Sequence, residues 1–263
     1  MVRAVEDAAF RRGYRIVVCN TDETRDKQHS YLQLLAGERV AGVILAPTYT
    51  DDPEIGRLLD VGTAVVAFDR PVADPRVDLV LANNQQATMH ATRHLLQAGH
   101  RRIGLISGPR EAWTGAERLE GYEHAMREAG EEPVSADGAF RVDGGREATA
   151  RLLDAHPDLT ALVFANNLMT AGGLQALRER GIAIPDRIAI TAIDDPFWAE
   201  LVDPPLTTFA QPVREMAATA VDLLFERINE TREVPRRVLF DFVLNARGSC
   251  GTAPDPEKKP WRA

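Results

Sequence analysis

The sequence has few cysteines: only Cys19 and Cys250 occur, and they stand in unrelated contexts. Cys19 ends an apolar stretch, whereas Cys250 lies close to the C-terminus. No CxxC spacing is present, so neither a disulfide framework nor a cysteine-based metal site is indicated. We expect two free thiols in a reducing compartment.

Long hydrophobic runs and an excess of positive charge are also missing. The longest apolar runs span about six residues, far short of a membrane-spanning helix. The first fourteen residues contain acidic side chains and no apolar core, which argues against a secretory signal. With a net charge of −8, the chain lacks the electrostatic footprint of a nucleic-acid-binding protein. We expect a cytoplasmic protein without membrane contact, and any DNA-binding module would have to lie elsewhere.

Signatures of catalysis and of cofactor binding are absent as well. The sequence contains no GxGxxG after a strand and no GxxxxGK[ST], HExxH or GxSxG motif. His90 and His94 are four residues apart and could share a helix face around a metal ion, but a pair on a helix surface is the simpler interpretation. We therefore predict no catalytic residues, no metal ligands, no cofactor and no enzymatic activity.

What the sequence does contain is a regular alternation of short apolar runs with amphipathic stretches. Apolar residues that recur three and four positions apart predict the helices. Nearly continuous apolar runs are typical of strands in parallel sheets. This alternation predicts an α/β fold built from βαβ units in two similar lobes. The strands are expected at 14–19, 40–46, 63–68, 78–81, 103–106, 134–140, 160–165, 187–193, 206–209 and 237–244.

Polar residues follow one predicted strand after another, and the stretch Gly99–Met126 shows this most clearly. There a strand ends at Gly108-Pro109 and leads into a helix that carries Arg118. Since α/β proteins bind ligands at the carboxyl ends of their strands, we expect the site there. Carboxylates, amides and an arginine suit a polyhydroxylated ligand, and aromatic rings can stack on a sugar. The candidates by position are Asp69, the doublets Asn83-Asn84, Asn166-Asn167 and Asp194-Asp195, Gln211, and the loop residues Arg118, Trp113 and Phe140.

Each of these residue types also has a purely structural interpretation. Asn167, Asp143 and Asp195 could be helix caps, and Asp69 could pair with the adjacent arginine. Trp113 and Phe140 could belong to the core. The recurrence of polar residues after successive strands favours a binding site.

Several sequence blocks, in order, resemble the LacI/GalR family of bacterial transcription regulators. They include GHRRIGLISGP followed by TGAERLEGYEHAM, then ITAIDD, PPLTTFAQP and LNARGS, and earlier RVAGVILAPT and AFDRP. The resemblance covers about residues 1–250 and is specific to the effector-binding region, which is similar to periplasmic sugar-binding proteins.

This resemblance implies two Rossmann-like lobes with parallel sheets joined by three crossovers, with a sugar or nucleoside effector in the cleft and a homodimer as the assembly. It also implies which residues contact the effector: Arg118, Asn166, Asp194 and Gln211, with further contacts from Asp69, Asn83, Trp113, Thr114 and Phe140. The expected N-lobe is 1–107 with 211–233, the expected C-lobe is 108–210 with 234–250, and 251–263 is expected to be a disordered tail. The family's helix-turn-helix and the first strand of its N-lobe have no counterpart here, so DNA would be bound only through that absent module. The alternative interpretation is a transport-type periplasmic sugar-binding protein.

Overall fold

The computed structural model describes residues 2–230 and 234–251, and these form two compact units. Unit 1 consists of the residues up to Ala82 together with Pro212–Phe240. Unit 2 consists of Asn83–Gln211 and the described residues from Asp241 onward. The chain passes between the units three times, so the predicted α/β architecture of two lobes with three crossovers is confirmed.

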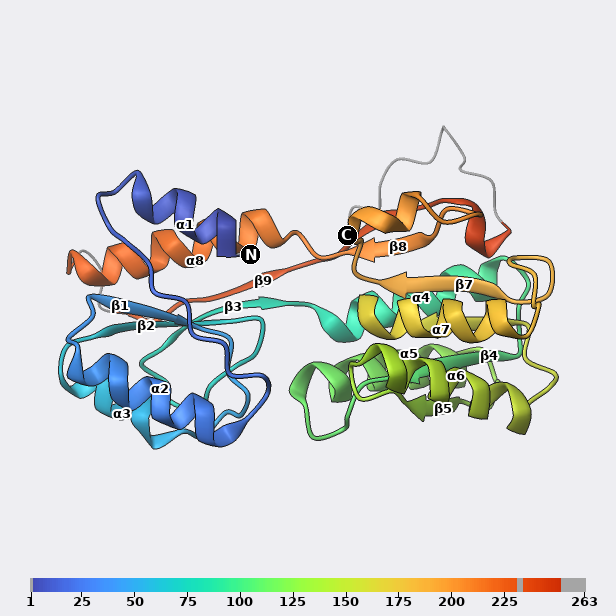
Figure 1. Cartoon of the computed structure of the whole chain (residues 1–263), viewed down its shortest axis with the longest axis horizontal. Coiled ribbons are helices and arrows are strands. Elements are labelled where there is room, and N and C mark those ends of the chain that lie inside the picture. The colour runs from blue at the N-terminus through green and yellow to red at the C-terminus, as the bar shows by residue number, and fades with distance from the viewer. Residues whose placement is uncertain (1, 231–233, 252–263) are drawn as a thin grey trace. The chain divides into compact units, whose positions relative to one another are not determined.

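Unit 1 is built on a four-stranded, fully parallel sheet in the order β1-β2-β3-β9. Helices α1 and α8 lie over one face of this sheet, and α2 and α3 lie over the other (Figure 1). The strands are β1 (Gly42–Leu45), β2 (Ala64–Phe68), β3 (Asp78–Ala82) and β9 (Arg237–Phe240). The helices are α1 (Val2–Phe10), α2 (Arg25–Gly37), α3 (Pro53–Asp60) and α8 (Val213–Ile228).

Unit 2 contains a six-stranded sheet in the order β10-β8-β7-β6-β4-β5, in which only β10 is antiparallel to its neighbour. Every residue of β4, β6 and β7 is buried, which explains their continuous apolar sequences. The strands are β4 (Ile103–Ser107), β5 (Val134–Asp137), β6 (Ala161–Phe164), β7 (Ala189–Ile193), β8 (Thr207–Ala210) and β10 (Val243–Asn245).

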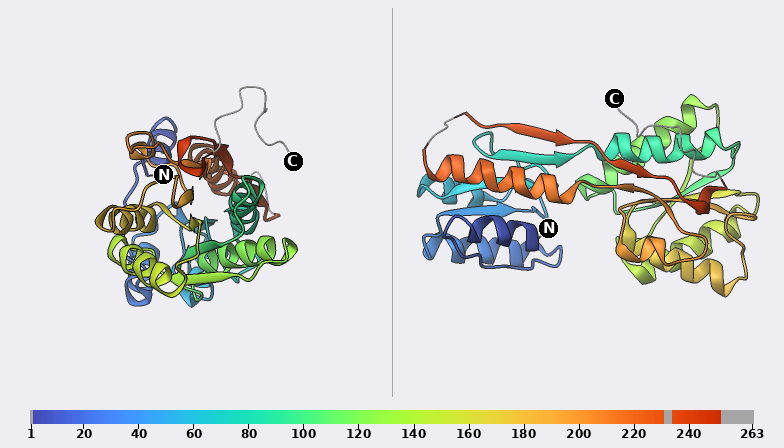
Figure 2. Two further views of the ribbon diagram at one scale, coloured as in Figure 1. Left: turned by 90° about the vertical axis from the view of Figure 1, so that its right-hand side faces the viewer. Right: turned by 90° about the horizontal axis from the view of Figure 1, so that it is seen from above.

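Two helices cover each face of the unit 2 sheet, α4 with α5 and α6 with α7 (Figure 2). Each pair packs closely because a glycine stands at the contact. A Cβ atom at Gly121 of α5 would lie 2.0 Å from the carbonyl oxygen of Gln85, and one at Gly172 of α7 would lie 1.9 Å from that of Val142. The helices are α4 (Asn84–Gln97), α5 (Trp113–Glu128), α6 (Val142–Ala155) and α7 (Asn167–Glu179), with short 3₁₀ turns η1 (Phe197–Glu200) and η2 (Gly248–Cys250).

The strand predicted at 14–19 is wrong, because this segment has no regular secondary structure. Val17 is 76% and Val18 is 60% exposed. Within the described residues, β1 is the edge of the unit 1 sheet on this side, and the segment does not pair with it. An apolar sequence becomes a strand only when a neighbouring backbone supplies its hydrogen bonds.

The predicted lobe boundaries also need correction. The expected division at 107/108 placed residues 83–107 in the N-lobe, yet β4 lies between β5 and β6 and α4 packs on α5, so both belong to unit 2. The strand predicted at 237–244 is two strands, of which β9 pairs with β3 in unit 1 and β10 pairs with β8 in unit 2. Unit 1 therefore extends to Phe240 rather than ending at residue 233. Apart from Gly251, the predicted disordered tail lies outside the described residues.

No helix in the described part of the chain is long and apolar enough to cross a membrane. Among the same residues, no group of three histidine, cysteine or acidic side chains is placed to hold a metal ion. His94 Nε2 lies 3.2 Å from the Sγ of buried Cys250.

Candidate functional site

The carboxyl ends of the parallel strands in unit 2 bring several predicted site residues to one edge of the sheet. Asn166 follows β6, Asp194 follows β7 and Gln211 follows β8. The ends of β6 and β7 are joined directly, because the backbone N–H of Asn167 donates to Asp194 Oδ2 at 3.3 Å. The structure thus places Asn166, Asp194 and Gln211 on neighbouring strands at the same edge.

Arg118 reaches this edge from α5 and is only 5% exposed. Its Nε donates to Asn84 Oδ1 at 2.7 Å, and its Nη1 donates to the carbonyl oxygen of Ala165 at 2.5 Å. Ala165 immediately precedes Asn166, so the guanidinium lies beside the end of β6. Among the described residues Nη2 has no hydrogen-bond partner, and no buried polar side-chain atom there lacks one, so Nη2 reaches solvent. Arg118 is therefore anchored on two sides and presents one amino group outward.

Asp194 has an unusual backbone conformation. Its φ of +73° is in the left-handed region, which non-glycine residues rarely adopt. The conformation is held in part by a 2.9 Å hydrogen bond from the Asp194 N–H to the carbonyl oxygen of Phe209 in β8. Such strain, imposed by the surrounding structure, is typical of functional sites.

Asp69 in unit 1 has the same features as Asp194. It directly follows β2, its φ is +67°, and its N–H donates to the carbonyl oxygen of Val80 at 2.9 Å. The expected alternative of an Asp69–Arg70 ion pair is present only at 4.0 Å. Arg70 instead makes two hydrogen bonds to the carboxylate of Glu23, at 2.5 and 2.9 Å.

Asn166 and Asn83 both serve as helix caps. Asn166 Oδ1 accepts from the N–H of Met169 at 2.8 Å, and Asn83 Oδ1 accepts from the N–H of Gln86 at 3.4 Å. Asn83 Nδ2 also donates to Asp241 Oδ1 at 3.0 Å. The Nδ2 of Asn166 has no partner among the described residues and is not buried, so capping leaves it available for a ligand.

The remaining candidates surround the turn after β4. Trp113 and Thr114 form the first residues of α5, Trp113 being half-buried and Thr114 buried. Phe140, between β5 and α6, packs on the core of unit 2, and its ring occupies the space over Gly108, where a Cβ atom would lie 2.1 Å from Cζ. Phe140 therefore has a packing role, as the core interpretation expected, while lying beside the same turn.

Sequence reasoning missed residues that support the site. In the pair Asn83-Asn84, it is the fully buried Asn84 that holds Arg118, and the doublet itself was the only signal. Asp195 is not a helix cap but the partner of Arg247, at 2.7 Å. Burial acts to raise the pKa of Asp195, but hydrogen bonds from Arg247 and Thr208 outweigh it and hold the pKa below its usual value.

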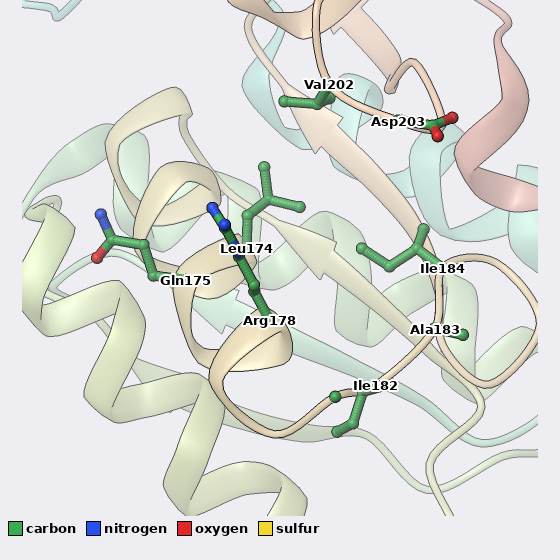
Figure 3. A pocket seen from close by; sticks show the side chains of 9 residues that line it. Leu174, Gln175, Arg178, Ile182, Ala183, Ile184, Val202 and Asp203 are labelled. Atoms are coloured by element: carbon green, nitrogen blue, oxygen red, sulfur yellow. The ribbon is translucent and has the colours of Figure 1, made fainter.

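A groove of about 610 Å³ opens elsewhere on unit 2 and contains none of the predicted site residues. Figure 3 shows Leu174 and Arg178 of α7 on one side, with Ile184 and Val202 on the neighbouring loops. Residues 181–184 precede β7 and residues 202–203 precede β8, so the groove lies toward the amino ends of the strands. Its lining is mostly apolar and lacks the converging polar groups of a sugar site.

Comparison with known proteins gives consistent matches. A family model for the periplasmic binding protein-like domain matches residues 92–250. The ribose operon repressor of Escherichia coli (strain K12) is 35% identical over 255 residues, covering 95% of this chain and 77% of that protein. The solved transcriptional regulator CelR–cellobiose complex aligns with a TM-score of 0.84 at 33% identity, covering 94% of this chain and 77% of that one. A LacI family transcriptional regulator from Enterococcus faecium, with bound ribose, aligns with a TM-score of 0.86 at 26% identity, covering 94% and 91%.

Proposed function

The chain belongs to the LacI family of transcriptional regulators, and on that premise we propose that it is the effector-binding part of such a regulator, with a small sugar-like molecule as the effector. The observation that carries the proposal is the convergence of Arg118, Asn166 and Asp194 at one edge of the unit 2 sheet. The sugars bound by the solved relatives support the choice of ligand class.

The chemistry of these side chains suits a polyhydroxylated ligand. The Asp194 carboxylate accepts hydrogen bonds from hydroxyl groups, the outward Nη2 of Arg118 donates to them, and the Asn166 amide supplies a further donor. Charge-assisted hydrogen bonds of this kind give directional selectivity for particular hydroxyls. Trp113 offers a half-buried ring for the apolar face of a sugar, and Gln211 offers an amide on the next strand.

We extend the proposal to Thr114, Phe140, Asn83 and Asp69 as supporting contacts. Phe140 packs on the turn after β4, and Thr114 lies in the first turn of α5, which follows it. Asn83 caps α4, whose first residue, Asn84, accepts a hydrogen bond from Arg118. Asp69 is included because it repeats, in unit 1, the strand-end position and left-handed backbone of Asp194. No enzymatic reaction forms part of this proposal.

A homodimer is proposed as the assembly, and a surface of unit 2 supports it. Phe197 is 86% and Leu201 is 76% exposed, and Val202, which follows Leu201, lines the apolar groove together with Leu174. Arg178 and Asp203 bring opposite charges to the lining of this groove, which suits a two-fold interface in which each patch meets its own copy. Leu201→Glu should then halve the mass measured by sedimentation equilibrium, whereas a wild-type monomer would contradict the dimer.

As a regulator, the protein would work by linked equilibria. Effector binding that favours one conformation of the dimer shifts the population toward it and so changes the affinity of attached DNA-binding modules for an operator. The proposal assigns DNA contact to a helix-turn-helix module, which the described residues do not form. A regulator of this kind acts where the DNA lies, so the proposal places it in the cytoplasm.

A thermal-shift screen of pentoses, hexoses, cellobiose and nucleosides tests the proposed function. A ligand present at a hundredfold excess over its Kd stabilises the folded protein by about 2.7 kcal/mol. For domains of this size that raises Tm by roughly 5–10 °C. We expect at least one sugar to give such a shift. Asp194→Ala should reduce it by about half or more, whereas Asp154→Ala, at an exposed position of α6, should retain it. A shift with nucleosides alone would show that the effector is a nucleoside and not a sugar. No shift with any compound would contradict the proposal.

A further inference from the structure

Asp195 and Arg247 lie next to the proposed effector contacts without belonging to them. We infer that this pair positions the effector site, by fixing the loop after β7 that carries Asp194 and the strand that leads to Gln211. The inference rests on the proposed function, in which Asp194 and Gln211 contact the sugar.

The Asp195 carboxylate is engaged from three directions. Arg247 Nη1 donates to Oδ1 at 2.7 Å and Nη2 donates to Oδ2 at 3.0 Å, a two-point contact that fixes orientation as well as distance. Thr208 Oγ1 donates to Oδ1 at 2.8 Å, and Asn245 Nδ2 donates to Oδ2 at 2.8 Å. One carboxylate thus joins the loop after β7 to β8 and to β10.

Arg247 is held as firmly as its partner. Its side chain is 15% exposed, and that of Asp195 is 23% exposed, so both are largely shielded from water. Nη1 also donates to the carbonyl oxygen of Leu206 at 2.8 Å, and Nη2 donates to Glu200 Oε1 at 2.9 Å. The backbone N–H of Arg247 donates to Thr207 Oγ1 at 2.9 Å. The guanidinium therefore holds the residues before β8, the turn η1 and Asp195 in one arrangement.

The loop needs this support because Asp194 has a left-handed backbone. Such a conformation persists in a non-glycine residue only when neighbouring contacts determine it. The backbone N–H of Asp194 donates a hydrogen bond to the carbonyl oxygen of Phe209 in β8. The next residue, Asp195, accepts a hydrogen bond from Thr208 Oγ1 of the same strand. Loss of the pair would release the carboxyl side of Asp194 and misplace its carboxylate.

The same pair fixes β8, which ends one residue before Gln211. Thr208 pairs in register with Asn245 of β10, and both donate to Asp195. Two proposed effector contacts, from different strands, therefore depend on one ion pair. Misplacement of binding groups by about an ångström is enough to weaken recognition substantially.

The test compares Arg247→Lys with Arg180→Lys. Lysine keeps the charge but cannot make the two-point contact. Arg180 makes the same kind of two-point contact, at 2.7 and 2.9 Å, to the exposed carboxylate of Asp154. Arg180→Lys is therefore a matched control. With D-ribose and cellobiose as probes, we expect Arg247→Lys to raise the Kd of the sugar that binds about tenfold, and Arg180→Lys to leave it within twofold.

Two further readouts separate positioning from general stability. Asp194→Ala should weaken sugar binding less in the Arg247→Lys background than in the wild type, since the displaced carboxylate then contributes less. In the sugar-free protein, amide exchange at Asp194 should rise at least tenfold in Arg247→Lys and remain unchanged in Arg180→Lys. Asp195→Asn replaces Arg247→Lys if the latter does not fold.

An unchanged Kd and unchanged exchange in Arg247→Lys would overturn the inference. If the wild type binds neither sugar, that result counts against the choice of effector, and the exchange measurement alone then decides whether the pair holds Asp194. The inference would also be contradicted if the losses of sugar-binding free energy caused by Arg247→Lys and Asp194→Ala were additive, since additivity means that the two residues act independently.

Discussion

Arg118 carries two roles that one set of variants can separate. Inside the protein, it satisfies the Asn84 side chain, which is fully buried, and the backbone carbonyl of Ala165. Toward solvent, it presents Nη2. Arg118→Met removes every hydrogen bond while keeping much of the side-chain volume. Arg118→Lys keeps the charge but puts one nitrogen in place of the two, Nε and Nη1, that reach separate acceptors.

The magnitude follows from the two internal bonds. Hydrogen bonds from a charged donor contribute about 1.5–3 kcal/mol each, and their loss leaves buried acceptors unsatisfied. We therefore expect Arg118→Met to lower the free energy of unfolding by about 3–6 kcal/mol, and Arg118→Lys by about 1.5–3 kcal/mol. Urea unfolding followed by circular dichroism measures both values. Arg151→Met, at an exposed helical position, is the control and should change stability by less than about 0.5 kcal/mol.

The ligand measurement then tests the second role. In Arg118→Lys, which should remain folded, we expect the sugar-induced rise in Tm to be lost. A loss of less than about 1 kcal/mol in Arg118→Met would refute the internal role, because two buried acceptors left without their donors destabilise the protein by more than that. A full sugar-induced shift in Arg118→Lys would refute the contact with the effector and leave Arg118 a structural residue.

Three further predictions concern packing, hydrogen bonding and pH. Gly121→Ala should destabilise the protein by about 1–3 kcal/mol, because the new Cβ would lie 2.0 Å from the carbonyl oxygen of Gln85. Gly37→Ala places its Cβ in open space and should stabilise the protein by up to about 1 kcal/mol. Thermal unfolding of the two variants measures the difference. Tyr122→Phe should cost about 1–3 kcal/mol in urea unfolding, since the buried hydroxyl accepts a 2.9 Å hydrogen bond from a backbone N–H. The pKa of Asp195 is lowered from 3.8 on folding, so its stabilisation is present above that value and is lost as the pH falls through the folded pKa. Asp195→Asn should therefore show a smaller fall in unfolding free energy between pH 5 and pH 3 than the wild type.

Much of the fold could be predicted from the sequence because the signals are local. Strands such as β4 and β7 are buried throughout and therefore read as continuous apolar runs. In a parallel sheet, the residues after each strand lie at the common edge, so the edge positions of Asn166-Asn167, Asp194-Asp195 and Gln211 followed from the alternation, and the family resemblance then selected Asn166 and Asp194.

What could not be predicted depends on which segments pair over long distances. The apolar segment at 14–19 has strand-like composition, but only a neighbouring backbone makes a strand. Residues 237–244 read as one strand, yet their halves pair with β3 and β8 in different units. Local pattern also gave no reason to assign α4 and β4 to unit 2, since that depends on the pairing of β4 with β5 and β6.

Side-chain partners in the site were hidden for the same reason. Asn83 and Asn84 are equivalent in sequence, and only the position of Arg118, 34 residues away, distinguishes them. Asp195 looked like a helix cap because its partner Arg247 is 52 residues distant. Such pairs become visible only when β8 and β10 are placed beside the loop after β7.

If unit 2 binds a sugar-like effector through Asp194, the affinity for that sugar must depend on the Asp194 carboxylate. Calorimetric titration of the most stabilising sugar from the screen into wild type, Asp194→Ala and the control Asp154→Ala measures this dependence. Loss of a charged hydrogen-bond acceptor costs about 1.5–3 kcal/mol, so Asp194→Ala should raise the Kd roughly 10- to 150-fold, with Asp154→Ala unchanged. Saturable binding of equal affinity in all three proteins would contradict the claim.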